Sequence, residues 1–195
     1  MKICLFGGIF DPPHIGHLMV AKNILKYYSF NRILFVPNQN PPHKNVKNIT
    51  FIDHRLEMLR LLTKENSKFI ISMEEINSRG KSFTINTIRL IKRKMGISSE
   101  DCSFAVGSDA LRDFHNWKLA REILNEASVL VVVRPGFEKI IAKPWVLDGI
   151  NVTPISSVEV SSENIRRKIK TNQQIKNLLT EDVYDYIIKN RLYKQ

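Results

Sequence analysis

The sequence predicts an α/β fold in which a doubly wound parallel sheet is followed by a helical C-terminal part. Short apolar runs rich in Ile, Val and Phe alternate with longer segments of helical period, as in successive βαβ units. The apolar runs are nearly continuous, which is typical of strands buried on both faces. The chain has 195 residues, of which 43% are hydrophobic and 25% charged, an ordinary globular composition. We expect a single domain over residues 1–195, with an α/β core at 1–155 and helices at 156–195.

The apolar runs predict the strands, and the segments between them predict the helices. The expected strands are Lys2–Phe6, Arg32–Pro37, Phe69–Met73, Ser103–Val106, Ser128–Arg134 and Asn151–Pro154. The expected helices are Ile15–Tyr28, Phe51–Leu62, Thr84–Met95, Lys118–Asn125, Ser161–Ile169 and Thr180–Lys189. Thr50, with Asp53 three residues later, is expected to cap the second of these helices. The segment from Pro37 to Thr50 contains Pro41 and Pro42 and is expected to be a long functional loop.

Charge and composition narrow the class of protein. Lys and Arg number 30 against 19 Asp and Glu, so the net charge of +11 favours an anionic partner: nucleic acid, an acidic lipid surface or a phosphorylated small molecule. No apolar run approaches the roughly 18 residues of a membrane span, so an integral membrane protein is excluded. Cys4 and Cys102 lie far apart and form no C-x-x-C pair, which favours a reducing cytoplasm.

The strongest chemical signal is the segment Gly7–His17, GGIFDPPHIGH, between the first strand and the first helix. Glycines at the end of a strand let backbone amides approach a ligand, and a helix N-terminus presents unpaired N–H groups to an anion. His14 and His17 are three residues apart and therefore share one face of the first helical turn, where both imidazoles can donate to phosphate oxygens. These features together predict a phosphate site.

Other interpretations of this segment remain open. The dinucleotide fingerprint G-x-G-x-x-G and the P-loop pattern G-x-x-x-x-G-K-[ST] are both absent, which excludes dinucleotide dehydrogenases and P-loop NTPases. The two histidines are also compatible with a simple helix cap, or with a structural zinc site completed by Asp11.

The string G-G-x-F-D-P-x-H-x-G-H resembles the signature of the nucleotidyltransferase superfamily that carries a His-x-Gly-His motif, here His14–His17. Among its families the chain is similar to the bacterial nicotinate-nucleotide adenylyltransferases, and the resemblance extends over nearly the whole chain. Further matching segments are Val36–Lys44, Arg55–Leu59, Ser82–Thr87, Gly107–Asp109, Phe114–Trp117, Arg134–Gly136 and Val160–Arg166. One departure is Glu163, where the family commonly has Thr.

The resemblance implies a Rossmann-like core and a Mg²⁺-dependent enzyme of NAD biosynthesis. Its reaction would transfer the adenylyl group of ATP to nicotinate mononucleotide by direct in-line attack, giving nicotinate adenine dinucleotide and pyrophosphate. In the catalytic set, His14 and His17 hold the triphosphate, while Lys44 and Arg166 neutralise charge on the leaving pyrophosphate. The implied ATP-binding residues are Gly7, Gly8, Ile9, Phe10, His14, His17, Gly107, Asp109, Ser161, Ser162, Ile165 and Arg166. The implied nicotinate-nucleotide-binding residues are Asn38, Lys44, Phe83, Thr84, Trp117 and Arg134.

Each of these roles has a structural alternative. Mg²⁺ is expected to arrive on the ATP phosphates, near Asp109, but that side chain is equally placed to cap the turn that follows it. The hydroxyls of Ser161 and Ser162 suit a helix cap as well as a phosphate. The aromatic rings of Trp117 and Phe83 are also suited to a hydrophobic core, and the basic side chains to a solvated surface.

Three competing functions remain at this level. An enzyme that prefers the amidated mononucleotide, or phosphopantetheine, would use the same histidines with a different acceptor pocket. A nucleic-acid-binding module would account for the charge, although no recognisable binding motif is present. A nucleotide sensor would bind ATP without chemistry. We expect small-molecule substrates, with neither nucleic acid nor membrane as partner, and the sequence is compatible with a homo-oligomer.

Overall fold

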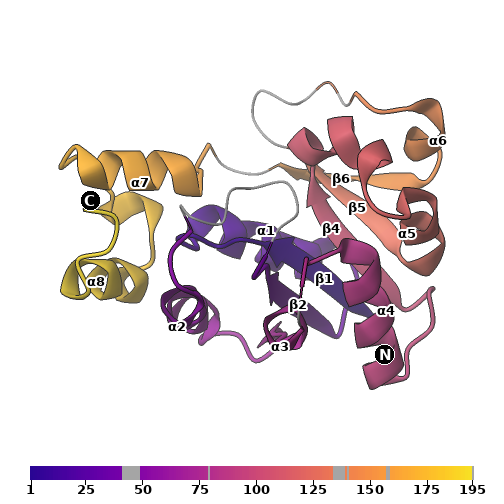
Figure 1. Ribbon diagram of the computed structural model, residues 1–195, viewed down its shortest axis with the longest axis horizontal. Coiled ribbons are helices and arrows are strands. Elements are labelled where there is room, and N and C mark those ends of the chain that lie inside the picture. Colours follow the sequence, from indigo (N-terminus) through magenta and orange to yellow (C-terminus); the bar gives the residue numbers. More distant parts are fainter. Residues whose placement is uncertain (41–48, 79, 134–138, 140, 157–158, 195) are drawn as a thin grey trace.

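The computed structural model describes residues 1–40, 49–78, 80–133, 139, 141–156 and 159–194, and in this part of the chain it contains one sheet. The sheet has six strands in the order β3-β2-β1-β4-β5-β6, and every neighbouring pair is parallel (Figure 1). The strands are β1 (Ile3–Gly8), β2 (Arg32–Pro37), β3 (Phe69–Ile71), β4 (Cys102–Gly107), β5 (Ser128–Val133) and β6 (Ile150–Ser156). The predicted α/β class with a Rossmann-like parallel sheet is confirmed.

The strand order creates a crevice at one point along the sheet edge. From β1 the chain moves outward to β2 and β3, and it then returns to β4 on the other side of β1. In open α/β sheets, ligands bind beyond the carboxyl ends of the strands at such a reversal. The first strand extends two residues further than predicted, and Gly7 pairs with Val36 and Gly8 with Pro37. Both glycines therefore lie at the carboxyl end of β1, beside the crevice.

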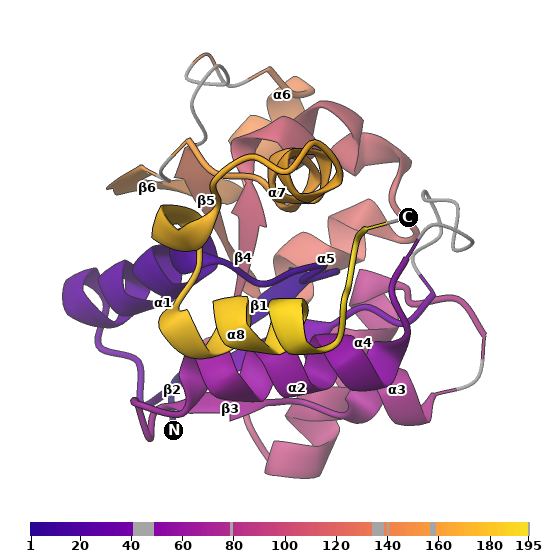
Figure 2. The same cartoon turned by 90° about the vertical axis from the view of Figure 1, so that its left-hand side faces the viewer.

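Helices cover both faces of the sheet. One face carries α1 (Ile15–Tyr27), α2 (Ile52–Thr63), α7 (Ser162–Lys170) and α8 (Glu181–Lys189). The other carries α4 (Thr84–Met95), the 3₁₀ segment η2 (Ser108–Asn116), α5 (Ala120–Glu126) and α6 (Pro144–Leu147). Two short elements complete the described part, α3 (Glu74–Asn77) and η3 (Lys176–Leu178). Figure 2 shows α8 lying along α2, with which it is in contact.

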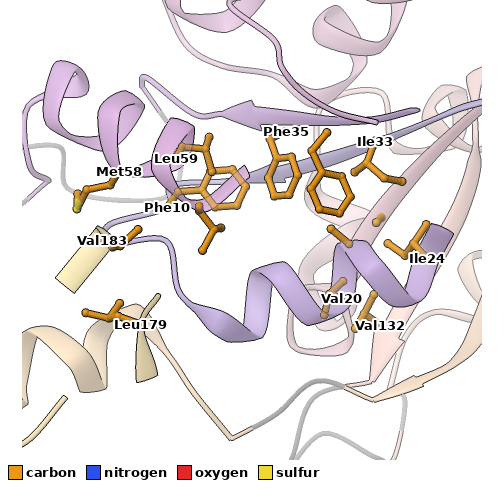
Figure 3. Close-up of a cluster of buried hydrophobic side chains, with 14 of the residues drawn as sticks. Phe10, Val20, Ile24, Ile33, Phe35, Met58, Leu59, Val132, Leu179 and Val183 are labelled. Carbon is orange, nitrogen blue, oxygen red and sulfur yellow. The ribbon is translucent and has the colours of Figure 1, made fainter. Parts of the chain in front are cut away.

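The alternation of side chains along the buried strands divides the core into two clusters. Cys4 in β1 points into the cluster on the α1 side, whereas Ile3 and Leu5 point into the cluster on the α4 side. The C-terminal helices are part of the first cluster. Figure 3 shows Leu179 and Val183 near Met58 of α2, in the cluster that also holds Phe10 and Phe35 of the N-terminal part. The predicted helical C-terminal part is thus present, and it shares a core with the sheet.

Several local predictions were wrong at element boundaries. Thr50 does not cap α2: the cap position is Phe51, without a side-chain hydrogen bond, and the Thr50 backbone N–H donates instead to Asp11 Oδ2 at 3.2 Å. Helix α5 begins later than predicted because Leu119 has a left-handed φ of 53° and the helix starts after it. The short elements α3, η2, α6 and η3 were not predicted as helices, since segments this short carry little periodic signal.

Two further findings concern the class of protein. The thiols of Cys4 and Cys102 are free and buried. Burial raises the pKa of Cys102 to about 11 and that of Cys4 further still, so both side chains act as apolar packing. In the described part of the chain, no helix has both the length and the apolar character that crossing a bilayer requires.

Candidate active site

The two histidines lie at the junction of β1 and α1, beyond the carboxyl end of β1. His14 occupies the N-cap position of α1, and its backbone N–H donates to Nδ1 of His17 at 3.2 Å. The imidazoles are stacked, with ring centroids 3.7 Å apart and planes inclined by 28°. Because Nδ1 of His17 accepts a hydrogen bond, the neutral ring carries its proton on Nε2, which can donate. The same two histidines therefore cap the helix and hold their imidazoles in a stacked pair.

A buried phenylalanine orients His17. Phe10 is 2% exposed, and its ring meets the His17 ring edge-on at a centroid distance of 4.9 Å. The Phe10 backbone has φ of 53°, a left-handed conformation that turns the chain back over the strand end. Gly8 makes this possible, since a Cβ at that position would lie 2.9 Å from the Phe10 ring. Phe10 was implied as an ATP-binding residue. Its side chain lies in the core and packs against the His17 ring.

A pocket of about 200 Å³ opens at the predicted crevice, beyond the carboxyl ends of β1 and β4. Side chains and backbone from β2, α3, α4 and η2 complete its wall. The structure brings six of the predicted site residues together there, from both the ATP and the nicotinate-nucleotide groups: Gly7, Asn38, Thr84, Gly107, Asp109 and Trp117. Residues that are distant in the sequence therefore form one site.

One wall of the pocket is aromatic. Trp117 lies 5.1 Å from Phe114 and 6.2 Å from Phe104, measured between ring centroids. These neighbours hold the indole so that it lines the pocket, whereas Phe114 is fully buried behind it. Phe83 lies at the N-cap of α4, where the Lys118 ammonium is 4.5 Å from its ring centroid. Trp117 therefore packs on core aromatics and also lines the pocket, and its role toward a substrate stays a prediction.

Sequence reasoning missed a buried carboxylate in this wall. Glu75 of α3 is 6% exposed and lines the pocket. Its Oε2 accepts a hydrogen bond from Asn38 Nδ2 at 2.7 Å, and its Oε1 accepts one from Thr87 Oγ1 at 2.7 Å. The carboxylate therefore fixes the Asn38 amide at the end of β2. In the sequence Glu75 follows another glutamate in a short segment, a pattern typical of a solvated surface, so no local signal marks it.

Helix α7 packs against the loop that precedes the histidines. Ser161 caps this helix, with its Oγ accepting the Asn164 backbone N–H at 3.1 Å. Ser162 instead donates its hydroxyl to the Pro12 carbonyl at 2.9 Å, and Arg166 Nη1 donates to the Asp11 carbonyl at 2.6 Å. Ile165 is fully buried in the core beneath them. The capping interpretation is thus confirmed for Ser161. Ser162 and Arg166 instead contact the loop that leads from β1 to His14.

The Asp11 carboxylate does not complete a metal site with the histidines. Its two oxygens accept hydrogen bonds from Tyr193 Oη and from the Thr50 backbone N–H. Within the ranges that the structure describes, there is no group of three or more His, Cys, Asp or Glu side chains suited to hold a metal ion. Two predicted site residues, Lys44 and Arg134, lie outside the described residues.

Comparison with known proteins identifies the family. The profile of the cytidylyltransferase-like family matches residues 5–168. The nicotinate-nucleotide adenylyltransferase of Bacillus subtilis is 35% identical over 193 residues, with 99% of this chain and 98% of that protein covered. A Caldicellulosiruptor saccharolyticus protein named "Probable nicotinate-nucleotide adenylyltransferase" is 36% identical over 201 residues, with both chains fully covered. The chain belongs to the nicotinate-nucleotide adenylyltransferase family.

The fold of this adenylyltransferase matches solved structures as well. The Plasmodium falciparum nicotinic acid mononucleotide adenylyltransferase complexed with NaAD has a TM-score of 0.78 at 23% identity, with 98% of this chain and 97% of that chain covered. The same parasite enzyme complexed with APC has a TM-score of 0.77 at 22% identity, with 98% and 96% covered. The resemblance drawn from the sequence motifs is confirmed, and the chain is an enzyme that transfers a nucleotidyl group.

Proposed function

We propose that this adenylyltransferase joins ATP and nicotinate mononucleotide, releasing pyrophosphate and nicotinate adenine dinucleotide. The observation that carries the proposal is the stacked pair of His14 and His17 at the carboxyl end of β1, where the His17 ring lies 6.0 Å, between centroids, from Phe6 in the lining of the aromatic-walled pocket. The names of its full-length relatives support the reaction, and the histidine pair and the pocket support a separate place for each substrate. The free, buried thiols of Cys4 and Cys102 agree with a reducing compartment, and we propose the cytoplasm.

The histidines are placed to hold the triphosphate. Nε2–H of His17 donates to an oxygen of the α- or β-phosphate, and His14 stands against it in the same stack. Arg166 uses one guanidinium N–H on the Asp11 carbonyl, and a guanidinium has further donors for a phosphate. Lys44 is proposed to add a second cation on the pyrophosphate side. Donors fixed in advance around the developing charge lower the barrier without reorganising during the reaction.

The chemical step needs no activated side chain. An oxygen of the acceptor's phosphate attacks the α-phosphorus of ATP in line, and a new P–O bond forms there. The bond from the α-phosphorus to the bridging oxygen of the β-phosphate breaks, and its electron pair leaves with pyrophosphate. The nucleophile is already an anion, so catalysis comes from positioning and from stabilising charge on the leaving group. This agrees with the described lining of the pocket, which has aromatic, amide and hydroxyl groups and the carboxylates of Glu75 and Asp109, but neither Ser nor Cys.

The chain's own groups fit a Mg²⁺ ion that is bound chiefly by substrate. Magnesium usually keeps several waters and binds one or two carboxylates together with nucleotide phosphates, and Asp109 offers one carboxylate in the pocket wall. When bound, the ion neutralises charge on the triphosphate as pyrophosphate departs. Asp109 is the residue we propose to orient it.

The acceptor pocket is proposed to prefer the acid over the amide. Trp117 offers a flat face for the pyridine ring, and the N-terminus of α4 at Thr84 points its backbone N–H groups toward a carboxylate. Donors arranged for a carboxylate are left poorly matched by an amide, which disfavours nicotinamide mononucleotide. Phosphopantetheine has no aromatic ring to place on the indole.

Site variants test the proposal. The assay measures pyrophosphate release from ATP, Mg²⁺ and nicotinate mononucleotide, with thermal unfolding as the test of fold. His17→Ala and Arg166→Ala are each expected to lower kcat by about a hundredfold or more, since each removes a donor to developing charge. The matched control is Arg167→Ala, because Arg167 is the exposed neighbour whose guanidinium, among the hydrogen bonds of the described residues, donates only to Asn164. Unchanged turnover in the first two variants would overturn their proposed roles, and tight nucleic-acid binding without turnover would favour the binding module.

A further inference from the structure

A network of hydrogen bonds around Asp11 connects the segment before the histidines to the C-terminal end of the described chain. Asp11 is 2% exposed, and its Oδ1 accepts a 2.7 Å hydrogen bond from the hydroxyl of Tyr193, 182 residues later in the sequence. Its Oδ2 accepts the backbone N–H of Thr50 at 3.2 Å. Asp11 precedes His14 by three residues, and the two residues between them are prolines whose φ is fixed. Asp11 and the histidines are therefore joined by a short segment with little backbone freedom.

The positive charge that balances Asp11 is also buried. Arg55 of α2 is 2% exposed and donates to three backbone carbonyls: that of Ile9 at 2.7 Å, that of Asn38 at 2.9 Å and that of Thr50 at 3.0 Å. Burial lowers the pKa of this guanidinium, and the Asp11 carboxylate opposes that shift. Arg55 thus fixes the backbone on either side of the crevice, while the carboxylate of Asp11 depends on its hydrogen-bond donors for its orientation.

Tyr193 reaches Asp11 by an unusual backbone path. After α8 the chain adopts left-handed φ angles at Arg191 and again at Tyr193, at 53° and 65°. This conformation is unfavourable for residues other than glycine and persists where surrounding contacts determine it. Burial and the neighbouring Asp11 both raise the pKa of the Tyr193 hydroxyl, which therefore stays protonated and remains a donor. The end of the chain is thus folded so as to present one hydroxyl to the loop.

We propose that Tyr193 is a positioning residue for adenylyl transfer, acting through Asp11 to hold His14 and His17 in their stacked arrangement. The inference rests on the function proposed above, because the histidines matter for turnover only if they hold the triphosphate. The C-terminal segment thereby becomes part of the active site's support, although it packs on the α1 side of the sheet and helix α4 of the pocket wall lies on the other side. The hydrogen bonds of the Tyr193 hydroxyl among the described residues go to Asp11 and Met58, neither of which lines the pocket, so its proposed effect is indirect.

A pair of tyrosine variants separates positioning from general stability. Tyr193→Phe removes the hydroxyl on Asp11, and Tyr186→Phe removes a hydroxyl that lies 2.9 Å from His54 Nδ1, between α8 and α2. Both changes delete one hydroxyl that ties the C-terminal part to the rest of the chain, and the Tyr193 hydroxyl also has a long contact of 4.0 Å to Met58 Sδ. Only the first touches the loop that carries the histidines. Tyr186→Phe therefore reports what the loss of a C-terminal contact does by itself.

The first readout is kinetic. We expect Tyr193→Phe to lower kcat by about tenfold, because small displacements of positioned groups reduce rates strongly, while the KM for nicotinate mononucleotide is unchanged. Tyr186→Phe is expected to keep the wild-type kcat. In an Asp11→Asn background, Tyr193→Phe is expected to add little further loss, since the two residues act through one contact. A kcat for Tyr193→Phe equal to that of Tyr186→Phe would overturn the inference.

The second readout is spectroscopic and needs no turnover. The imidazole resonances of the five histidines are followed by NMR in each variant. Tyr193→Phe is expected to shift the signals of His14 and His17 and to leave that of His54 in place, and Tyr186→Phe is expected to do the reverse. Absence of turnover in the wild type, with this pattern of shifts, would overturn the proposed function alone. Turnover in the wild type with unmoved His14 and His17 signals would overturn the positioning role alone.

Discussion

Gly8→Ala tests the packing that places His17. A Cβ at Gly8 would lie 2.9 Å from Cζ of Phe10 and 3.0 to 3.2 Å from two further ring atoms, closer than side-chain carbons normally approach. The ring cannot move aside freely, because it is 2% exposed and packs against Phe6, Phe35 and His17. Overpacking of this kind destabilises a fold by about 1–3 kcal/mol. For a chain of this size, each kcal/mol lowers Tm by about 2–4 °C.

The neighbouring glycine provides the control. A Cβ at Gly7 would meet Phe104 at 3.5 Å, an ordinary contact distance, so Gly7→Ala is expected to change the free energy of unfolding little. Urea denaturation of the two variants and the wild type measures the difference. A second test is the double variant Gly8→Ala with Phe10→Leu, in which the smaller side chain relieves the clash and the two free-energy changes are not additive. Equal stability of Gly8→Ala and Gly7→Ala would refute the reasoning.

Two further predictions concern stability. Glu75→Ala removes the acceptor of the Asn38 amide and the nearer of the two acceptors of the Thr87 hydroxyl, which keeps the Phe83 carbonyl at 3.4 Å. The variant is expected to destabilise the fold by about 1–3 kcal/mol, measured by urea denaturation, and Glu75→Gln, which keeps an acceptor, should lose less. A hydrogen bond from Lys92, together with one from a neighbouring arginine, holds the pKa of Glu126 below its ordinary value. Its stabilising contribution is therefore present at neutral pH and is lost as the pH falls from about 4.5 through the lowered folded-state pKa. Thermal unfolding across this range should show the difference between wild type and Glu126→Gln shrinking toward acid, and a constant difference would contradict the assignment.

The sequence predicts the strands and part of the site from local pattern. Long apolar runs predict buried strands, and the strand ends predict ligand-binding positions for Gly7 and Asp109, while the family resemblance adds Gly107; all three line one pocket. The spacing of His14 and His17 predicted that they share a face, and they stack.

Contacts between distant segments could not be predicted in this way. Thr50 has the residue type of a helix cap, but its N–H is used by Asp11 from another loop. Glu75 carries no local signal, and Arg55 is marked in the sequence only as part of a segment that matches the family. The tertiary fold shows that Glu75 is buried against Asn38 and that Arg55 is buried against backbone carbonyls. Local sequence patterns do not predict hydrogen-bond partners that are distant in the sequence. The residues that support the site have such distant partners.

A comparison of acceptors tests the central claim most directly. Pyrophosphate release from ATP and Mg²⁺ is measured with nicotinate mononucleotide, nicotinamide mononucleotide and phosphopantetheine offered separately, and each product is identified by its mass. The account predicts strong preference for the acid mononucleotide and a product with the mass of nicotinate adenine dinucleotide. Preference for either other acceptor would leave the roles of His14 and His17 standing but contradict the pocket assigned to Trp117 and Thr84, and no release with any of the three would contradict the proposed reaction itself.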